Sequence, residues 1–164
     1  MCFRKWSGRT LYFENFEKIN LMIKNLAIAS DHAGYKLKQF LVENLKDLNI
    51  KDFGTNDEES CDFPDFASKV CDFVLHDTSF SGVLICGSGV GMSIAANKFR
   101  GIRAANVVDV ETAKQSVEHN DINVLCLGSK NVNEKDVLDI VKIFLEAKFI
   151  QKEKYIRRIS KLEQ

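Results

Sequence analysis

Short apolar runs alternate with amphipathic helical stretches along the chain from Asn25 onward. Helical stretches of about 10–15 residues separate the runs, and their apolar residues recur at a 3.6-residue period. Because the runs lack the polar alternation of a half-exposed strand, they indicate strands buried on both faces. This order predicts a single Rossmann-like α/β domain of three layers, with a five-stranded parallel sheet and helices on both faces. The predicted strands are 26–30, 50–54, 82–86, 102–108 and 123–128.

The composition is that of one compact domain. The 164 residues are 45% hydrophobic, which is enough for a buried core. Lys and Arg together number 23 and so do Asp and Glu, so the chain lacks the basic excess typical of nucleic-acid binders. No apolar run approaches the roughly 18–20 residues that a membrane span needs. We therefore expect neither a nucleic acid nor a membrane as a partner.

The five cysteines do not form a metal or disulfide pattern. The chain has no C-x-x-C and no Cys/His cluster with zinc spacing, so we expect no metal site. An odd number of cysteines without a convincing secretory signal predicts free thiols and a cytoplasmic location. The five are Cys2, Cys61, Cys71, Cys86 and Cys126.

The two ends of the chain are basic. Residues 1–24 have scattered apolar side chains, and we expect a poorly ordered N-terminal extension there, with Met22 as an alternative start. The domain is then expected to span 25–164 and to end in a helical arm. Residues 148–164 carry a net charge of +4. Such an arm is either a solvated helix face or a basic segment that meets an anion, for example across a subunit contact.

Polar residues follow four of the predicted strands. In parallel sheets, ligands bind beyond the carboxyl ends of the strands. Those positions are held by Asp31-His32, the 87–91 loop, Asp109 and Ser129-Lys130. His119-Asn120 lies just before the fifth strand, so its contribution depends on how the preceding helix ends.

The 87–91 loop is the strongest of these signals. Gly87, Gly89 and Gly91 allow a tight turn whose N–H groups face a helix start, an arrangement that favours anions. The spacing matches neither the dinucleotide fingerprint nor the P-loop. A tight turn without any ligand is the alternative. Cys86 precedes the loop, where a helix N-terminus would favour the thiolate, although such a cysteine can also be an inert small hydrophobe.

Two other polar groups have equally plain alternatives. Asp31-His32 could be a helix N-cap, and His119 could be a residue that interacts with a helix C-terminus. These structural explanations become weaker if all the groups meet at one sheet edge, where together they would form a site.

Several segments resemble one enzyme family. Asp31–Gly34 opening a helix, Asp62-Phe63-Pro64, the 86–98 block, Gly101–Ala104 and His119–Asp121 are similar to ribose-5-phosphate isomerase type B, of the ribose/galactose isomerase family. The resemblance covers about residues 24–163. It implies an aldose–ketose isomerase that needs no metal and no cofactor, acting on ribose 5-phosphate and ribulose 5-phosphate in the non-oxidative pentose phosphate pathway.

The resemblance also implies roles for residues. Cys86 would be the base that takes the proton from C2, and Ser88 would assist proton transfer. The backbone amides of 87–91 would bind the enediolate oxygens. His119 with Asp31 would open the sugar ring, and Asn120 would donate a hydrogen bond to the substrate. The amide-bearing residues are Gly87, Ser88, Gly89, Val90 and Gly91.

Phosphate binding is where this chain departs from the family. The positions implied are His32 and Lys130, together with Lys154 and Arg158 from the tail of a partner subunit. The implied assembly is a homodimer with shared active sites, with a dimer of dimers as a further option. Lys130 and Lys154 stand where relatives often have Arg. Lysine keeps the charge but loses the planar bidentate fork of arginine.

Further departures are Tyr155 in place of His and Phe63 in place of Tyr.

Three other functions are alternatives to the ribose isomerase. One is an isomerase of a six-carbon sugar 6-phosphate, allose or galactose. A second is a nucleotide-binding α/β module, because Asp109 follows Gly91 by 18 residues. The third is a family member that has lost its catalytic activity. The presence of Cys86, Ser88, Asp31 and His119 together argues against this alternative.

Overall fold

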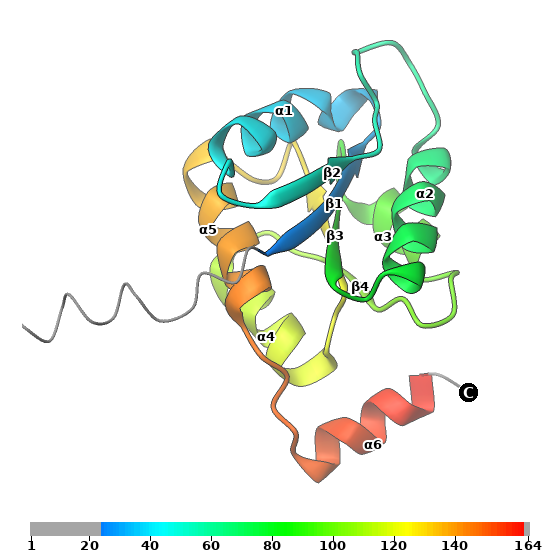
Figure 1. Cartoon of the computed structure of the whole chain (residues 1–164), viewed down its shortest axis with the longest axis vertical. Coiled ribbons are helices and arrows are strands. Elements are labelled where there is room, and N and C mark those ends of the chain that lie inside the picture. Colours follow the sequence, from blue (N-terminus) through cyan, green and yellow to red (C-terminus); the bar gives the residue numbers. More distant parts are fainter. Residues whose placement is uncertain (1–23, 163–164) are drawn as a thin grey trace, which may run out of the picture.

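The computed structural model describes residues 24–162 (Figure 1). The predicted extension, 1–24, lies outside the described residues except for Lys24. Lys24 belongs with the domain, because its Nζ donates to the carbonyl of Leu145 at 2.7 Å and its own carbonyl accepts from Asn49 N–H. The strands are β1 Asn25–Ser30, β2 Asn49–Asp52, β3 Phe80–Cys86, β4 Ala104–Asn106 and β5 Val124–Gly128. The helices are α1 Tyr35–Asn44, α2 Phe63–His76, α3 Val90–Ala96, α4 Val110–Asn120, α5 Glu134–Glu146 and α6 Glu153–Leu162.

The strands form one parallel sheet in the order β2-β1-β3-β5-β4, which confirms the predicted fold. Ser30 lies beside Ile85, and Cys86 lies beside Gly128. The carboxyl ends of the three central strands are therefore level with one another. The polar segments that follow them in the sequence meet at this edge.

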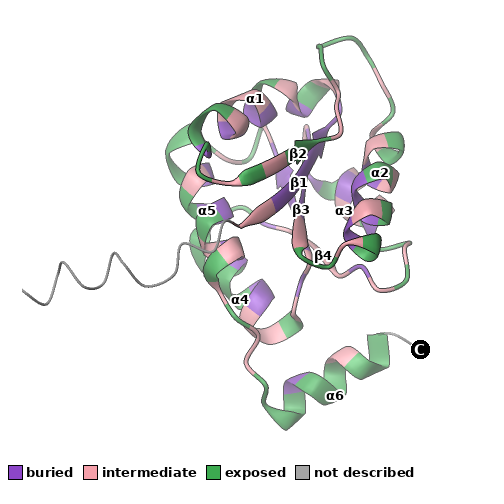
Figure 2. Ribbon diagram, viewed as in Figure 1, coloured by how far each residue is buried: buried purple, intermediate pink, exposed green. Residues whose placement is uncertain are grey.

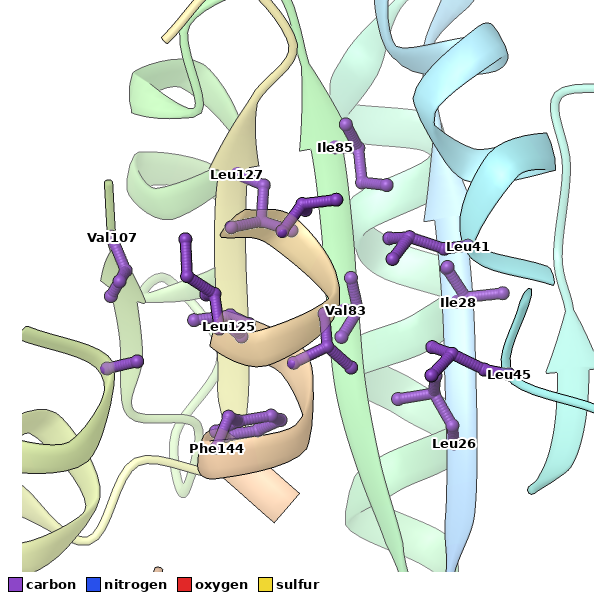
Figure 3. Close-up of a cluster of buried hydrophobic side chains, with 14 of the residues drawn as sticks. Leu26, Ile28, Leu41, Leu45, Val83, Ile85, Val107, Leu125, Leu127 and Phe144 are labelled. Carbon is purple, nitrogen blue, oxygen red and sulfur yellow. The ribbon is translucent and has the colours of Figure 1, made fainter. Parts of the chain in front are cut away.

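Two layers of helices cover the sheet. The larger cluster packs α1, α4 and α5 on one face, with Leu41, Leu125, Leu127 and Phe144 among its side chains (Figure 3). The smaller cluster packs α2 and α3 on the other face. The residues at positions 26–29 of β1 are fully buried, because both faces of the strand are covered (Figure 2).

Local signals account for the starts of three helices. Pro64 lies in the first turn of α2, where its missing N–H costs no hydrogen bond. The Asn133 side chain caps α5 by accepting from Lys135 N–H and Asp136 N–H. The side chain of Asp109 likewise caps α4, through Thr112 N–H.

Three predicted details differ from the structure. The apolar stripe from Leu37 to Leu48 predicts one helix, but α1 ends at Asn44, and Leu45 packs into the core from the turn that follows. The fourth strand is only Ala104–Asn106, because pairing with β5 is confined to those residues. The spacing of Phe66, Val70, Phe73 and Val74 predicts the buried stripe of α2, but Phe66 and Phe73 are half-buried. Smaller side chains, including that of Cys71, fill the core instead.

The last helix stands apart from the sheet. α6 is mostly exposed, and its one buried side chain is that of Tyr155 (Figure 2). The segment that leads into α6 passes the end of α4 (Figure 1). There Ile150 N–H donates to the carbonyl of Glu118. Among the helices of residues 24–162, no helix has the length and apolar character to cross a membrane.

Candidate active site

Three loops are hydrogen-bonded together at the carboxyl edge of the sheet. Asp31 N–H, after β1, donates to the carbonyl of Ile85 at 3.1 Å. Ser129, after β5, donates its N–H to the carbonyl of Cys86 at 2.8 Å and its Oγ–H to the carbonyl of Ala33 at 2.7 Å. The expectation that the segments after β1, β3 and β5 lie together is therefore confirmed.

Asp31 and His32 are both held by backbone groups. The Asp31 carboxylate is buried and accepts from Gly34 N–H at 3.0 Å, so it does cap the short 3-10 turn His32–Gly34. The Nδ1 atom of His32 lies 3.2 Å from the backbone nitrogen of Cys61 and 3.3 Å from the carbonyl oxygen of the same residue. When Nδ1 accepts from that nitrogen, the ring proton is on Nε2, which can then donate to an anion.

Cys86 ends β3 with a buried side chain that is 5% exposed. Its Sγ accepts a hydrogen bond from Gly89 N–H at 3.1 Å, and such a bond stabilises negative charge on the sulfur. Cys71 and Cys126 lie in the same apolar cluster and are fully buried. Burial raises the pKa of the Cys71 thiol to about 12 and also raises the pKa of the Cys126 thiol. These two neighbours therefore stay protonated at neutral pH.

The 87–91 loop turns through a left-handed glycine. Gly89 has φ +77°, a conformation that side-chain-bearing residues rarely adopt. Ser88 is exposed beside it, and its Oγ accepts from Val90 N–H at 3.3 Å. The helix that follows, α3, has only seven residues, so its macrodipole is short. What this segment can offer an anion is therefore the individual N–H groups of its first turn, which have no intrahelical acceptors.

Two side chains border the loop. The Phe63 ring would lie 3.0 Å from a Cβ placed on Gly91, so it packs directly against the backbone there. Lys130 is exposed, and its N–H donates to the carbonyl of Gly87 at 3.1 Å. Lys130 thus brings a positive charge to the loop that carries Cys86.

His119 and Asn120 are not at this edge. α4 runs from the carboxyl end of β4 back to the amino end of β5, so its last residues reach the opposite edge of the sheet. β5 starts at Val124, which pairs with Gly82, four residues before Cys86. At about 3.3 Å per residue, the two edges are roughly 13 Å apart. The position of His119 was left to depend on where the preceding helix ends, and within a single chain that helix ends at the edge opposite Asp31.

The residues at the opposite edge form a second group. The His119 ring stacks on the Tyr155 ring, with 4.5 Å between centroids. Lys154 and Arg158 are exposed on the same helix as Tyr155. A cleft of about 620 Å³ lies alongside and is bordered by Asn120 and by Leu162 of α6. The implied site residues thus fall into two groups at opposite edges of the sheet.

Sequence reasoning missed the residues that support these groups. Arg103 donates from Nε to the carbonyl of Asp121 and from Nη2 to its carboxylate, both at 2.7 Å, and so fixes the turn after His119. Arg103 lies in the family-like segment Gly101–Ala104, and Asp121 lies in the family-like segment His119–Asp121. Their presence in these segments was the signal that could have found them. Cys61 behind His32 had no such signal, because it acts through its backbone.

Asp109 does not behave as a nucleotide-binding acid. Its carboxylate accepts Thr112 N–H at 2.7 Å as the cap of α4, and that bond lowers the pKa of Asp109. The group already has a structural task, which leaves the nucleotide-binding alternative without its main support. Within residues 24–162, no three His, Cys, Asp or Glu side chains are grouped so that they could hold a metal ion.

Comparisons with known proteins agree with this geometry. The family model described as Ribose/Galactose Isomerase matches residues 26–162. Ribose-5-phosphate isomerase B of Escherichia coli strain K12 is 41% identical over 127 residues, which are 76% of this chain and 83% of that protein.

Solved structures give the same answer. Ribose-5-phosphate isomerase B of Clostridium thermocellum is 42% identical with a TM-score of 0.81, covering 85% of this chain and 95% of that one. The enzyme of Mycoplasma genitalium, solved with bound ribulose-5-phosphate, is 43% identical with a TM-score of 0.79, covering 85% of this chain and 93% of that one. The chain therefore belongs to the ribose/galactose isomerase family.

Proposed function

We propose that this protein interconverts ribose 5-phosphate and ribulose 5-phosphate by moving a proton between C2 and C1. The observation that carries the proposal is the Cys86 sulfur, which ends a central strand and accepts a backbone hydrogen bond from the glycine loop. The loops hydrogen-bonded beside it carry a buried carboxylate, an imidazole and an ammonium group, contributed by Asp31, His32 and Lys130. The relatives named ribose-5-phosphate isomerase B, one of them with bound ribulose-5-phosphate, support the ribose substrate over a six-carbon sugar phosphate.

In the proposed reaction Cys86 is the base. Its thiolate takes the proton from C2, the C–H electron pair forms the C1=C2 bond, and negative charge moves to the oxygen on C1. The N–H groups of 87–91 other than Gly89 N–H, which donates to the Cys86 sulfur, would stabilise that oxygen. Return of the proton from the thiol to C1 gives the ketose. The Ser88 hydroxyl, which is exposed, would carry a proton from the C2 oxygen to the C1 oxygen.

Ring opening and part of the phosphate binding require the second group of residues. His119 would act with Asp31 on the ring oxygen and the C1 hydroxyl, Asn120 would bind a hydroxyl, and Lys154 with Arg158 would bind the phosphate. In one chain these residues are at the edge of the sheet opposite Cys86. A homodimer that places each chain's second group against its partner's glycine loop would complete both sites. We propose that assembly, with two shared sites per dimer.

The exposed arm is consistent with such a dimer. α6 has exposed Ile156 and Leu162, which are 49% and 69% exposed, and the cleft beside Asn120 is bordered by Leu162. Apolar side chains of this kind gain from burial against a second chain.

We also propose a cytoplasmic location, because the four cysteines of residues 24–162 are free thiols, which suits a reducing compartment.

The experiment is a direct isomerisation assay with EDTA present. Ribose 5-phosphate is expected to be converted at a kcat/KM at least tenfold above that for allose 6-phosphate or galactose 6-phosphate. A preference for either six-carbon substrate would replace the proposed one. Absence of turnover on all three would contradict the proposed function.

A further inference from the structure

Two asparagine side chains converge on one backbone carbonyl next to Cys86. Asn106 ends β4, and Asn131 follows β5. The Nδ2 atom of each lies 3.2 Å from the carbonyl oxygen of Ser88. A carbonyl oxygen can only accept, so both side chains must present their NH₂ groups to it. The orientation of both amides is therefore determined by Ser88.

The bonded carbonyl belongs to the same peptide unit as Gly89 N–H. That N–H donates to Cys86 Sγ at 3.1 Å. A trans peptide unit is planar and its C=O and N–H point in opposite directions. Holding the oxygen on the side of the two asparagines therefore directs the N–H to the sulfur. If this plane turned over, the N–H would leave the sulfur and the carbonyl dipole would face it.

The packing around the peptide is close enough to make this contact specific. A Cβ placed on Gly89 would lie 2.2 Å from Oδ1 of Asn106, and one placed on Gly128 would lie 2.5 Å from the carbonyl carbon of Ser88. The absence of side chains at both glycines lets the asparagine and β5 reach the peptide. Asn106 Oδ1 is buried without a hydrogen-bond partner, an arrangement that costs stability. Asn106 is thus better explained by what its Nδ2 holds than by its contribution to the core.

We propose that Asn106 and Asn131 are positioning residues, which lock the Ser88–Gly89 peptide so that its N–H stabilises the Cys86 thiolate. This inference rests on the proposed function, in which Cys86 is the base. Neither asparagine need touch the substrate. Both act through the peptide unit, so their loss weakens the base rather than the binding of the sugar phosphate.

The test removes the two donors without adding charge. The variants are Asn131→Ala, Asn106→Leu and the double variant, with Asn44→Ala as the matched control. Asn44 also donates to a backbone carbonyl, that of Phe40, but it does so from the exposed surface of α1. The measurement is the rate of iodoacetamide labelling of Cys86 against pH, read by mass spectrometry on its own peptide.

Other ionisable groups around Cys86 stay unchanged in these variants. They are the thiols of Cys71 on α2 and Cys126 on β5, the Asp31 carboxylate and the His32 imidazole after β1, and the Lys130 ammonium after β5. The α3 segment contributes none. A change in the labelling profile therefore reports on the peptide and not on a new charge.

The double variant is expected to move the pH midpoint of Cys86 labelling upward by about one unit, because a hydrogen bond to the charged form is lost. Its kcat for ribose 5-phosphate is expected to fall about tenfold while KM changes less than twofold. Asn131 is exposed, so Asn131→Ala is expected to fold and to show part of the same shift.

A labelling profile identical to that of the Asn44→Ala control, in both Asn131→Ala and the double variant, would overturn the proposal. So would an increase in KM with kcat unchanged. The labelling profile does not depend on turnover. Retained activity in Cys86→Ser would contradict the proposed function, whereas the labelling profile would still decide whether the two asparagines hold the peptide.

Discussion

The His119 and Tyr155 rings stack with their planes inclined by only 17°. This contact joins the end of α4 to α6, and Tyr155 is the buried residue of that helix. It places a family-like histidine and the basic arm in one group, at the edge of the sheet opposite Cys86. The position of α6, and with it Lys154 and Arg158, therefore depends on an aromatic contact of a residue that departs from the family pattern.

Replacing Tyr155 tests that dependence. Tyr155→Ala removes the stacking, worth about 0.5–1.5 kcal/mol beyond area burial, and should free α6 from the domain. We expect KM for ribose 5-phosphate to rise about tenfold and proteolysis within residues 153–162 to accelerate. Tyr155→Phe keeps the ring and should behave like the original protein. An unchanged proteolysis rate in Tyr155→Ala would show that other contacts hold the helix.

The basic arm should act on substrate binding. Arg158→Ala is expected to raise KM about tenfold or more with kcat little changed, because a charge-assisted contact to phosphate is worth roughly 1.5–3 kcal/mol in both ground and transition states. Lys154→Arg restores a bidentate donor and should lower KM. Steady-state kinetics on ribose 5-phosphate measures both changes. A fall in kcat at constant KM in Arg158→Ala would argue against phosphate binding by the arm.

Mixing Cys86→Ser chains, which lack the base, with Arg158→Ala chains, which are expected to be slow at low substrate concentration, tests whether the sites are shared. Cys86→Ser and Arg158→Ala chains, combined in one dimer, place both lesions in one site and none in the other. Activity assayed at low substrate concentration should then return in part. Mixed dimers that form, as shown by mass spectrometry, and are no more active at low substrate concentration than the mean of the two parent dimers would rule out the shared site.

The ion pair between Lys38 of α1 and Asp52 predicts that removing the carboxylate destabilises the fold more than removing the buried lysine charge. Lys38 is fully buried and forms an ion pair with Asp52 at the end of β2. Asp52→Ala leaves the ammonium without its partner and should cost about 3 kcal/mol of unfolding free energy. Lys38→Met removes the buried charge itself and should cost less than about 1.5 kcal/mol. Urea denaturation of the two variants compares them, and equal losses would contradict this account.

Sequence periodicity was sufficient for the sheet and for half of the site. The segments after β1, β3 and β5 were expected together, because parallel strands align their carboxyl ends and their flanking residues are visible in the chain. The place of His119 stayed open because it depends on the direction of α4, which carries it to the amino end of β5. Asn106 and Asn131 gave no periodic signal. Their role depends on two strand ends meeting one carbonyl, which only the folded chain displays.

The cap of α4 predicts a dependence of stability on pH. Asp109 accepts Thr112 N–H, and the pKa of its carboxyl is below the ordinary value in the folded chain. Its contribution to stability is therefore complete above the unfolded pKa, near 3.8, and is lost as pH falls through the lower folded value. Asp109→Asn keeps the cap without the charge. The part of the stability loss at low pH that comes from protonating Asp109 should therefore be absent in this variant, as measured by thermal denaturation between pH 5 and pH 2.

The thiols should differ sharply in reactivity. Because burial raises the pKa of Cys71 to about 12 and raises that of Cys126 as well, both stay protonated and inert toward iodoacetamide at pH 7.5 in the folded protein. Cys86 should be labelled, and saturating ribose 5-phosphate should protect it. Cys61 is half-buried beside His32, so a Cys61→Ser background removes its signal. Labelling of Cys71 or Cys126 before Cys86 would contradict this order.

The most direct test of the assigned base is the turnover of Cys86→Ser on ribose 5-phosphate. A hydroxyl is a far weaker base than a thiolate at neutral pH, so kcat should fall by at least a hundredfold while circular dichroism and melting temperature stay those of the original protein. A folded Cys86→Ser enzyme with near-normal kcat would remove Cys86 from the reaction and contradict the account.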